Sequence, residues 1–172
     1  MESKNDLSQS VLDRAGRVRL LLMDCDGVLT DGRLYFTADG EEMKVFNVRD
    51  GQGLASWHAA GFESGIVSGR GGREIIMKRA IELGVKYTHT GSKNKVADVL
   101  EIFGEAGVDK DEVAFMGDDL GDLEAMKLVG FPVAVGDAIG EVRAAAAYIT
   151  TRKGGRGAIR EVTDLLLSLK SR

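Results

Sequence analysis

The chain has 172 residues, of which 44% are hydrophobic and 29% charged. This length fits one domain with a single hydrophobic core, and the composition excludes a disordered, collagen-like or disulfide-stapled chain. The formal net charge of −4 gives no electrostatic reason to expect nucleic acid or an anionic membrane as a partner. We therefore predict a single domain over residues 1–172 with neither kind of partner.

Cysteine usage and hydropathy indicate the compartment. Cys25 is the only cysteine, so the chain cannot form an internal disulfide, which fits a reducing environment. No apolar run approaches the roughly 18 residues of a membrane span, and the chain does not open with a basic-then-apolar signal. We expect a cytoplasmic protein.

The predicted elements alternate along the chain. Residues 1–17 are polar with little periodicity, so we expect a short helix or a loose N-terminal arm there. Short apolar runs that predict buried strands follow at residues 18–23, 63–68, 113–116 and 131–135. Helical spacing is found at residues 53–60, 73–83, 95–106 and 120–129. This alternation predicts an α/β fold, a three-layer Rossmann-like open parallel sheet with helices on both faces.

One segment breaks the alternation directly after the first strand. Residues 34–37 and 41–48 predict two strands joined by an Asp39-Gly40 turn, which is a strong hairpin signal. Because the hairpin follows the acidic end of the first strand, it should project over the carboxyl edge of the sheet, where open α/β sheets bind ligands. We predict a β-hairpin flap over residues 33–48.

Acidic side chains follow two of the predicted strands. Asp24 and Asp26 come directly after the first one, and Asp118, Asp119 and Asp122 follow the strand at residues 113–116. Carboxylates this close repel one another unless a cation holds them, and Mg²⁺ prefers oxygen ligands. The alternative is that the acidic turns merely cap the elements that follow.

Two further polar signals lie at equivalent places. The strand at residues 63–68 ends in Ser68-Gly69-Arg70, which offers a hydroxyl, backbone N–H groups and a guanidinium to an anion. Lys95 stands at the start of a predicted helix, where it can add a positive charge. Each signal alone can be explained without a function, as a turn or as a solvated lysine. All of them, however, lie at the carboxyl edge of the predicted sheet.

The ordered set Asp24-x-Asp26, Ser68, Lys95 and Asp118-Asp119 resembles the four motifs of the haloacid dehalogenase superfamily of phosphotransferases. The resemblance implies that Asp24 attacks phosphorus to form an aspartyl-phosphate and that Asp26 is the general acid and base. It also implies that Mg²⁺ is held by Asp24, Asp118 and the backbone carbonyl of Asp26. Ser68 and Lys95 would hold the phosphate, and Lys95 would offset the charge of Asp24.

The same resemblance gives Asp119 and Asp122 supporting roles around the metal. Neither usual insertion point has room for a cap domain, so the resemblance is to the capless subclass. Capless members often use a neighbouring subunit as a lid, and the resemblance implies a homotetramer in which neighbouring subunits complete the active site.

Within that subclass, residues 26–32, 46–51, 68–70 and 154–161 resemble phosphatases that hydrolyse 3-deoxy-D-manno-octulosonate 8-phosphate in lipopolysaccharide sugar biosynthesis. This closer resemblance places residues 47–51 at the sugar, where the hairpin returns, and brings Arg70 and Arg79 to the sugar acid or its phosphate. The residues it assigns to the substrate are Asp26, Asn47, Val48, Arg49, Asp50, Gly51, Ser68, Gly69, Arg70, Arg79 and Lys95.

Several alternatives stay open. The same chemistry would serve a nine-carbon keto-acid sugar 9-phosphate or a broad range of small phosphate esters, although Arg70 and Gly53 favour the eight-carbon substrate. A response-regulator receiver domain would have its acidic pair first and its lysine last, and a regulatory relative without activity would not need both Asp24 and Asp26. The glycine-rich residues 153–157 either start the last helix or bind the substrate carboxylate.

Overall fold

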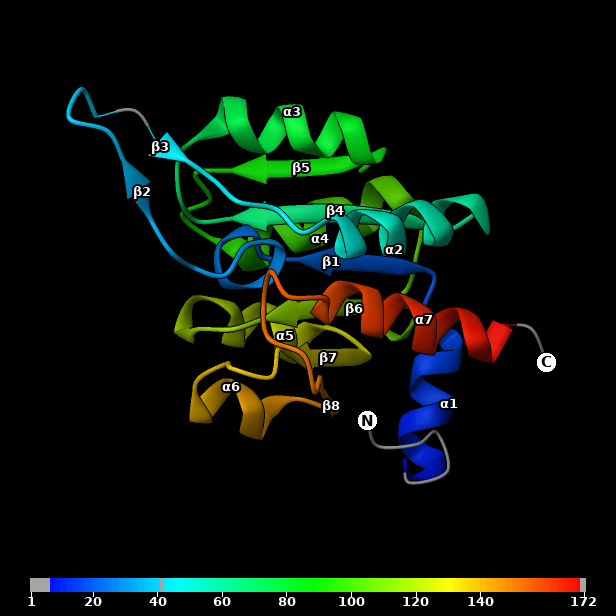
Figure 1. The fold of residues 1–172 in the computed structure, drawn as a ribbon. Coiled ribbons are helices and arrows are strands. Elements are labelled where there is room, and N and C mark those ends of the chain that lie inside the picture. Colours follow the sequence, from blue (N-terminus) through cyan, green and yellow to red (C-terminus); the bar gives the residue numbers. More distant parts are fainter. Residues whose placement is uncertain (1–6, 41, 171–172) are drawn as a thin grey trace.

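The computed structural model describes residues 7–40 and 42–170 and shows a six-stranded parallel sheet in the order β5-β4-β1-β6-β7-β8 (Figure 1). The strands are β1 (Leu20–Met23), β4 (Glu63–Ser68), β5 (Tyr87–Thr90), β6 (Val113–Gly117), β7 (Phe131–Ala134) and β8 (Tyr148–Ile149). The predicted open parallel sheet is confirmed.

Helices cover both faces of this sheet. They are α1 (Gln9–Arg17), α2 (Val48–Ala59), α3 (Arg73–Leu83), α4 (Lys95–Ala106), α5 (Leu123–Leu128), α6 (Gly140–Ala145) and α7 (Ala158–Lys170). In Figure 1, α2 and α7 lie side by side in front of the sheet, while α4 and α5 pack together behind it. The three-layer architecture is therefore confirmed. No helix in the described part of the chain combines the length and apolarity needed to cross a membrane.

The central strand β1 fixes the place of the site. All four of its residues are buried, and its last residue, Met23, is paired with Ile66 of β4 on one side and Met116 of β6 on the other. Because the three strands are parallel and in this register, their carboxyl ends meet at one edge. The residues that follow them, including Asp24 and Asp118, therefore emerge next to one another.

Most element boundaries agree with the pattern, and the differences have local causes. β1 begins at Leu20 instead of residue 18, because the N–H of Val18 donates to the carbonyl of Ala15 and ends α1. The segment 120–129 begins as a short 3-10 turn (Leu120–Asp122) before α5. The apolar pattern predicted none of β5, β8 and α6: β5 has the largely polar sequence Tyr-Thr-His-Thr, and β8 and α6 are only two and six residues long.

The predicted hairpin is present but shorter than expected. Its strands are β2 (Tyr35–Phe36) and β3 (Glu42–Met43), paired antiparallel, and Figure 1 shows them projecting beyond the carboxyl edge of the sheet. The expected return strand over 41–48 is wrong at its far end, because α2 begins at Val48. The side chain of Asn47 ends the extended segment: its Oδ1 accepts the N–H of Arg49 at 2.8 Å, which is an N-cap.

Three of the predicted ranges reach beyond the described residues. Residues 1–6 of the expected N-terminal arm, residue 41 of the hairpin and residues 171–172 of the predicted domain lie outside them. Within the arm, residues 9–17 form α1, which is capped by the Ser8 side chain.

Candidate active site

The loop after β1 winds tightly over residues Cys25–Leu29 and carries the first two aspartates. Gly27 sits in it with φ +86°, a backbone conformation that side-chain-bearing residues rarely adopt. A Cβ at Gly27 would lie 2.0 Å from Oδ2 of Asp118, so only glycine lets this loop approach the acidic residue after β6. The Thr30 hydroxyl stabilises the turn by accepting the N–H groups of Gly27 and Gly32.

Three carboxylates converge at this edge. Asp24, Asp118 and Asp122 each place an oxygen within 4.8 Å of the other two. Asp122 is 1% exposed, and its Oδ2 accepts the N–H groups of Asp118 at 3.0 Å and Asp119 at 3.3 Å. Asp122 therefore fixes the loop after β6, whereas the exposed side chain of Asp119 accepts the N–H of Leu120 and caps the turn.

Lys95 is the cation of this cluster. Its Nζ lies 3.0 Å from Oδ1 of Asp24 and 2.7 Å from Oδ1 of Asp122, and its side chain is only 11% exposed. Burial would lower the pKa of Lys95, but the two carboxylates outweigh it and hold the pKa above its usual value. The ammonium group therefore stays charged beside Asp24.

One lysine does not neutralise three acids. Burial, the charge of Asp122 and other nearby acids raise the pKa of Asp118 to about 8, and burial and Asp122 raise that of Asp24 to about 6, in spite of Lys95. Oδ1 of Asp118 is buried and has no hydrogen-bond partner among the described residues. Oxygen ligands, excess negative charge and an unpaired buried oxygen fit a hard divalent cation such as Mg²⁺.

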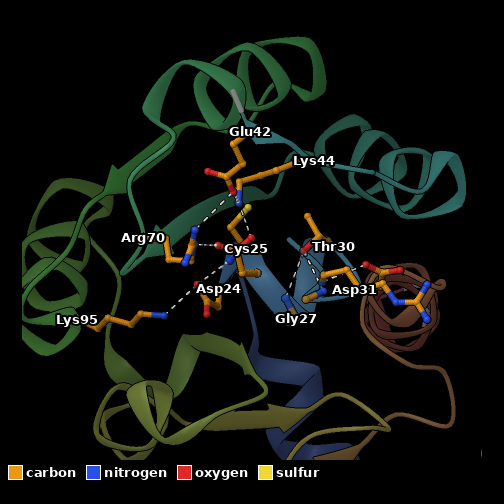
Figure 2. A network of polar contacts seen from close by, with 12 residues as sticks. Asp24, Cys25, Gly27, Thr30, Asp31, Glu42, Lys44, Arg70 and Lys95 are labelled. Carbon is orange, nitrogen blue, oxygen red and sulfur yellow. Dashed lines mark hydrogen bonds and ion pairs between the residues drawn. The ribbon is translucent and has the colours of Figure 1, made fainter. Parts of the chain in front are cut away.

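Asp26 points to a second cluster, which the hairpin supplies. Its Oδ1 lies 2.5 Å from Nζ of Lys44, and Lys44 also lies 2.9 Å from Oε1 of Glu42. Arg70, after β4, lies 3.6 Å from Oδ2 of Asp26 and 3.8 Å from Glu42. Figure 2 shows Glu42 and Lys44 reaching down from the hairpin toward this loop, with Arg70 and Lys95 approaching from another side.

Ser68 and Gly69 provide a place for an anion beside Lys95. The Ser68 hydroxyl is buried and has no hydrogen-bond partner among the described residues. Gly69 follows it, and a Cβ on Gly69 would lie 3.9 Å from Cε of Lys95. An unpaired hydroxyl next to a lysine can donate to a phosphate oxygen.

The structure separates residues 47–51 into two groups. Asn47 reaches the C-terminal segment through its Nδ2, which donates to the carbonyl of Gly155, while Val48 and Arg49 are exposed on the first turn of α2. Asp50 and Gly51 are buried instead. The Asp50 carboxylate accepts two N–H groups near the start of α7, at 3.1 and 3.0 Å, so it joins two helices and does not line the carboxylate cluster.

Arg79 lies on the same side as these residues. Its guanidinium stands 5.4 Å above the ring of Phe46 and donates to Glu82, and a Cβ on Gly51 would meet it at 2.8 Å. The structure thus places Arg79 against the base of the hairpin and the first turn of α2.

The glycine-rich segment at residues 153–157 packs on the loop after β1. A Cβ at Gly154 would lie 1.7 Å from the carbonyl oxygen of Gly27, and the N–H of Gly155 donates to the carbonyl of Val28. Arg156 forms an ion pair with Asp31 at 3.1 Å, and Lys153 is exposed. The segment therefore supports the loop that carries Asp24 and Asp26, and α7 follows it.

Sequence reasoning missed Glu42 and Lys44. The available signal was their spacing: residues two apart in a flap strand point to the same face, and that strand was predicted to project over the site. This spacing was not recognised, because the return strand of the hairpin is short and partly polar.

Three comparisons with known proteins agree with this geometry. A family model of haloacid dehalogenase-like hydrolases matches residues 85–161. The 3-deoxy-D-manno-octulosonate 8-phosphate phosphatase of Escherichia coli K12 is 40% identical over 161 residues, which cover 94% of this chain and 85% of that relative.

Solved structures of similar proteins also match nearly the whole chain. The phosphatase of that name from Yersinia pestis has a TM-score of 0.93 at 39% identity, covering 96% of this chain and 89% of that one. The one from Moraxella catarrhalis, in complex with a magnesium ion, a phosphate ion and a KDO molecule, has a TM-score of 0.90 at 35% identity, covering 94% and 92%.

Proposed function

The chain belongs to the family of 3-deoxy-D-manno-octulosonate 8-phosphate phosphatases, and from this we propose that it is a Mg²⁺-dependent phosphatase that hydrolyses this ester to the free sugar acid and phosphate. The observation that carries the proposal is the meeting of Asp24, Asp118 and Lys95 at one edge of the sheet, next to the unpaired hydroxyl of Ser68. The resemblance noted above assigns the reaction to lipopolysaccharide sugar biosynthesis. Cys25 is a buried free thiol, in keeping with a cytoplasmic location.

Asp24 is the nucleophile in this proposal. A carboxylate oxygen of Asp24 attacks phosphorus, the bond from phosphorus to the sugar oxygen breaks, and an aspartyl-phosphate forms. Lys95 offsets the negative charge of Asp24, so that it can approach an anionic ester, and Ser68 donates a hydrogen bond to a phosphoryl oxygen. Asp24, Asp118 and the backbone carbonyl of Asp26 would hold Mg²⁺, which when bound would supply positive charge to the phosphoryl group.

Asp26 is the acid and then the base. It gives a proton to the departing sugar oxygen and later takes one from the water that hydrolyses the aspartyl-phosphate. Arg70, 46% exposed and beside Asp26, is available to the carboxylate of the sugar acid. We propose that Arg79 and Asn47 line the substrate site where the hairpin meets α2.

We propose further that the 172 residues act as one domain and assemble into a homotetramer whose neighbouring subunits complete the site. The evidence for assembly is a group of exposed apolar side chains. Five large hydrophobic residues on or beside the hairpin are 46% to 82% exposed, namely Leu34, Phe36, Met43, Val45 and Val48. An exposed apolar patch of this kind marks a protein interface. Light scattering after gel filtration tests the assembly, and a monomer would refute it.

Phosphate release tests the activity. We expect Mg²⁺-dependent turnover of 3-deoxy-D-manno-octulosonate 8-phosphate that EDTA abolishes, with kcat/KM at least about 100-fold above that for a nine-carbon keto-acid 9-phosphate and an aryl phosphate. A hundredfold preference is about 2.7 kcal/mol of differential transition-state binding. Equal rates on all three esters would support the phosphatase chemistry but refute the assignment of 3-deoxy-D-manno-octulosonate 8-phosphate as the specific substrate. No turnover of any would refute the phosphatase.

A further inference from the structure

The hairpin places a buried lysine against Asp26 that the proposed chemistry does not use. The side chain of Lys44 is 2% exposed, and its Nζ lies 2.5 Å from Oδ1 of Asp26 and 2.9 Å from Oε1 of Glu42. A buried ammonium group is costly unless it is paired, and here two carboxylates pair it. Lys44 is therefore held in one place by both of its partners.

The two oxygens of Asp26 have different surroundings. Oδ1 accepts the hydrogen bond from Lys44. Oδ2 is buried and has no hydrogen-bond partner among the described residues; Nε of Arg70 lies 3.6 Å from it, which exceeds a hydrogen-bond distance. The carboxyl group thus has one fixed oxygen and one that is left for another partner.

We propose that Lys44 is a positioning residue for Asp26: by holding Oδ1, it makes Oδ2 the oxygen that gives and takes the proton. The inference rests on the proposed function. In the first half-reaction the proton on Oδ2 moves to the sugar oxygen as its bond to phosphorus breaks and the Asp24–phosphorus bond forms. In the second, water gives a proton to Oδ2 as its oxygen bonds to phosphorus and Asp24 leaves as a carboxylate.

Glu42 positions Lys44 from the side opposite Asp26. It belongs to β3, and its carboxylate contacts both Lys44 and Arg70. Through these contacts the position of the hairpin determines where the ammonium group sits, and hence how Asp26 is turned. Arg70 is less suited to the same role, because its side chain is 46% exposed and its distance to Asp26 is longer.

The leaving group distinguishes a positioned acid from general structural support. A sugar alkoxide needs a proton to depart, whereas 2,4-dinitrophenolate departs as a stable anion. General acid catalysis contributes about 10²–10⁴-fold. We therefore expect Lys44→Met to slow the first turnover of the sugar phosphate by roughly 100-fold and that of 2,4-dinitrophenyl phosphate by less than about threefold. Rapid-quench measurement of the first turnover excludes the later hydrolysis step, which both substrates share.

Matched variants complete the experiment. Lys86 makes an ion pair of the same 2.5 Å length with Glu63, just before β5, so Lys86→Met should leave both first turnovers unchanged. Lys44→Arg keeps the charge and should restore part of the sugar phosphate rate. If Lys44→Met does not fold, as judged by circular dichroism, Glu42→Gln takes its place, with a smaller loss of the same selectivity.

The outcomes separate the two proposals. Equal slowing of both substrates in a folded Lys44 or Glu42 variant, or no slowing of either, would overturn the positioning role while the phosphatase stands. A wild-type protein that turns over neither substrate would overturn the proposed function and the positioning role with it.

Discussion

Asp118→Asn should make the metal-free protein less sensitive to alkaline pH, although it removes a proposed metal ligand. Burial and the neighbouring carboxylates raise the pKa of Asp118 from 3.8 to about 8. Because the folded-state pKa is the higher one, the proton-linked stability is fully present below pH 3.8 and is lost as the pH rises to about 8. Asparagine resembles the protonated acid and carries no charge, so it avoids this loss.

The size of the effect follows from the shift. One excess proton in the folded state corresponds to about 1.4 kcal/mol per pH unit, or about 4 kcal/mol between pH 5 and pH 8. Asp118 is only partly buried, and solvent screening reduces the value, so we expect about 2 kcal/mol. In a domain of this length that corresponds to a Tm change of roughly 4–8 °C.

Thermal unfolding in EDTA at pH 5 and pH 8 measures this. The Tm of the wild type should fall between pH 5 and pH 8, and the Tm of Asp118→Asn should fall by at most half as much. Mg²⁺ should restore the wild-type Tm at pH 8 and should not act on the variant. Asp119→Asn is the matched control, because this neighbour is exposed and asparagine caps a helical turn equally well. Identical losses in wild type and Asp118→Asn would refute the electrostatic reasoning.

Three shorter predictions follow from the same geometry. Asp24→Asn should reduce turnover to below a few per cent of wild type with an unchanged circular dichroism spectrum, and a higher rate would contradict an aspartyl-phosphate. Gly154→Ala should cost more than about 3 kcal/mol of unfolding free energy in a urea titration, because its Cβ would lie 1.7 Å from a carbonyl oxygen, whereas Gly104→Ala, in an open position of α4, should gain up to about 1 kcal/mol. Asp50→Ala should cost about 2–4 kcal/mol in the same titration by leaving two N–H groups near the start of α7 without their acceptor, and a change below 0.5 kcal/mol would contradict that role.

The sequence predicted the sheet well because its buried strands have a simple signal. The four residues of β1 are all apolar and all buried, and the run at residues 63–68 forms β4 over the same range. Parallel order then brings the residues after each strand to one edge, so the sequence is sufficient to predict the meeting of Asp24, Asp118 and Lys95.

The hairpin could not be predicted as well, because its form depends on side-chain contacts. Its strands are two residues long, and α2 begins where a strand was expected, since Asn47 caps the helix with its own side chain. The sequence placed Asp50 in a substrate loop but gave no sign that its buried carboxylate accepts the N–H of Gly157, 107 residues away and just before α7. Such long-range pairing leaves no periodic signal.

The glycine-rich turn before α7 has a consequence for the order of folding. The N–H of Gly155 donates to the carbonyl of Val28, so the loop that carries the nucleophile gains its support from a segment made 127 residues later. During synthesis at roughly 5–20 residues per second, a nascent chain would hold the first strand for several seconds before that support leaves the ribosome. Truncated chains that end before the turn should therefore keep much of the sheet and yet have no organised active site.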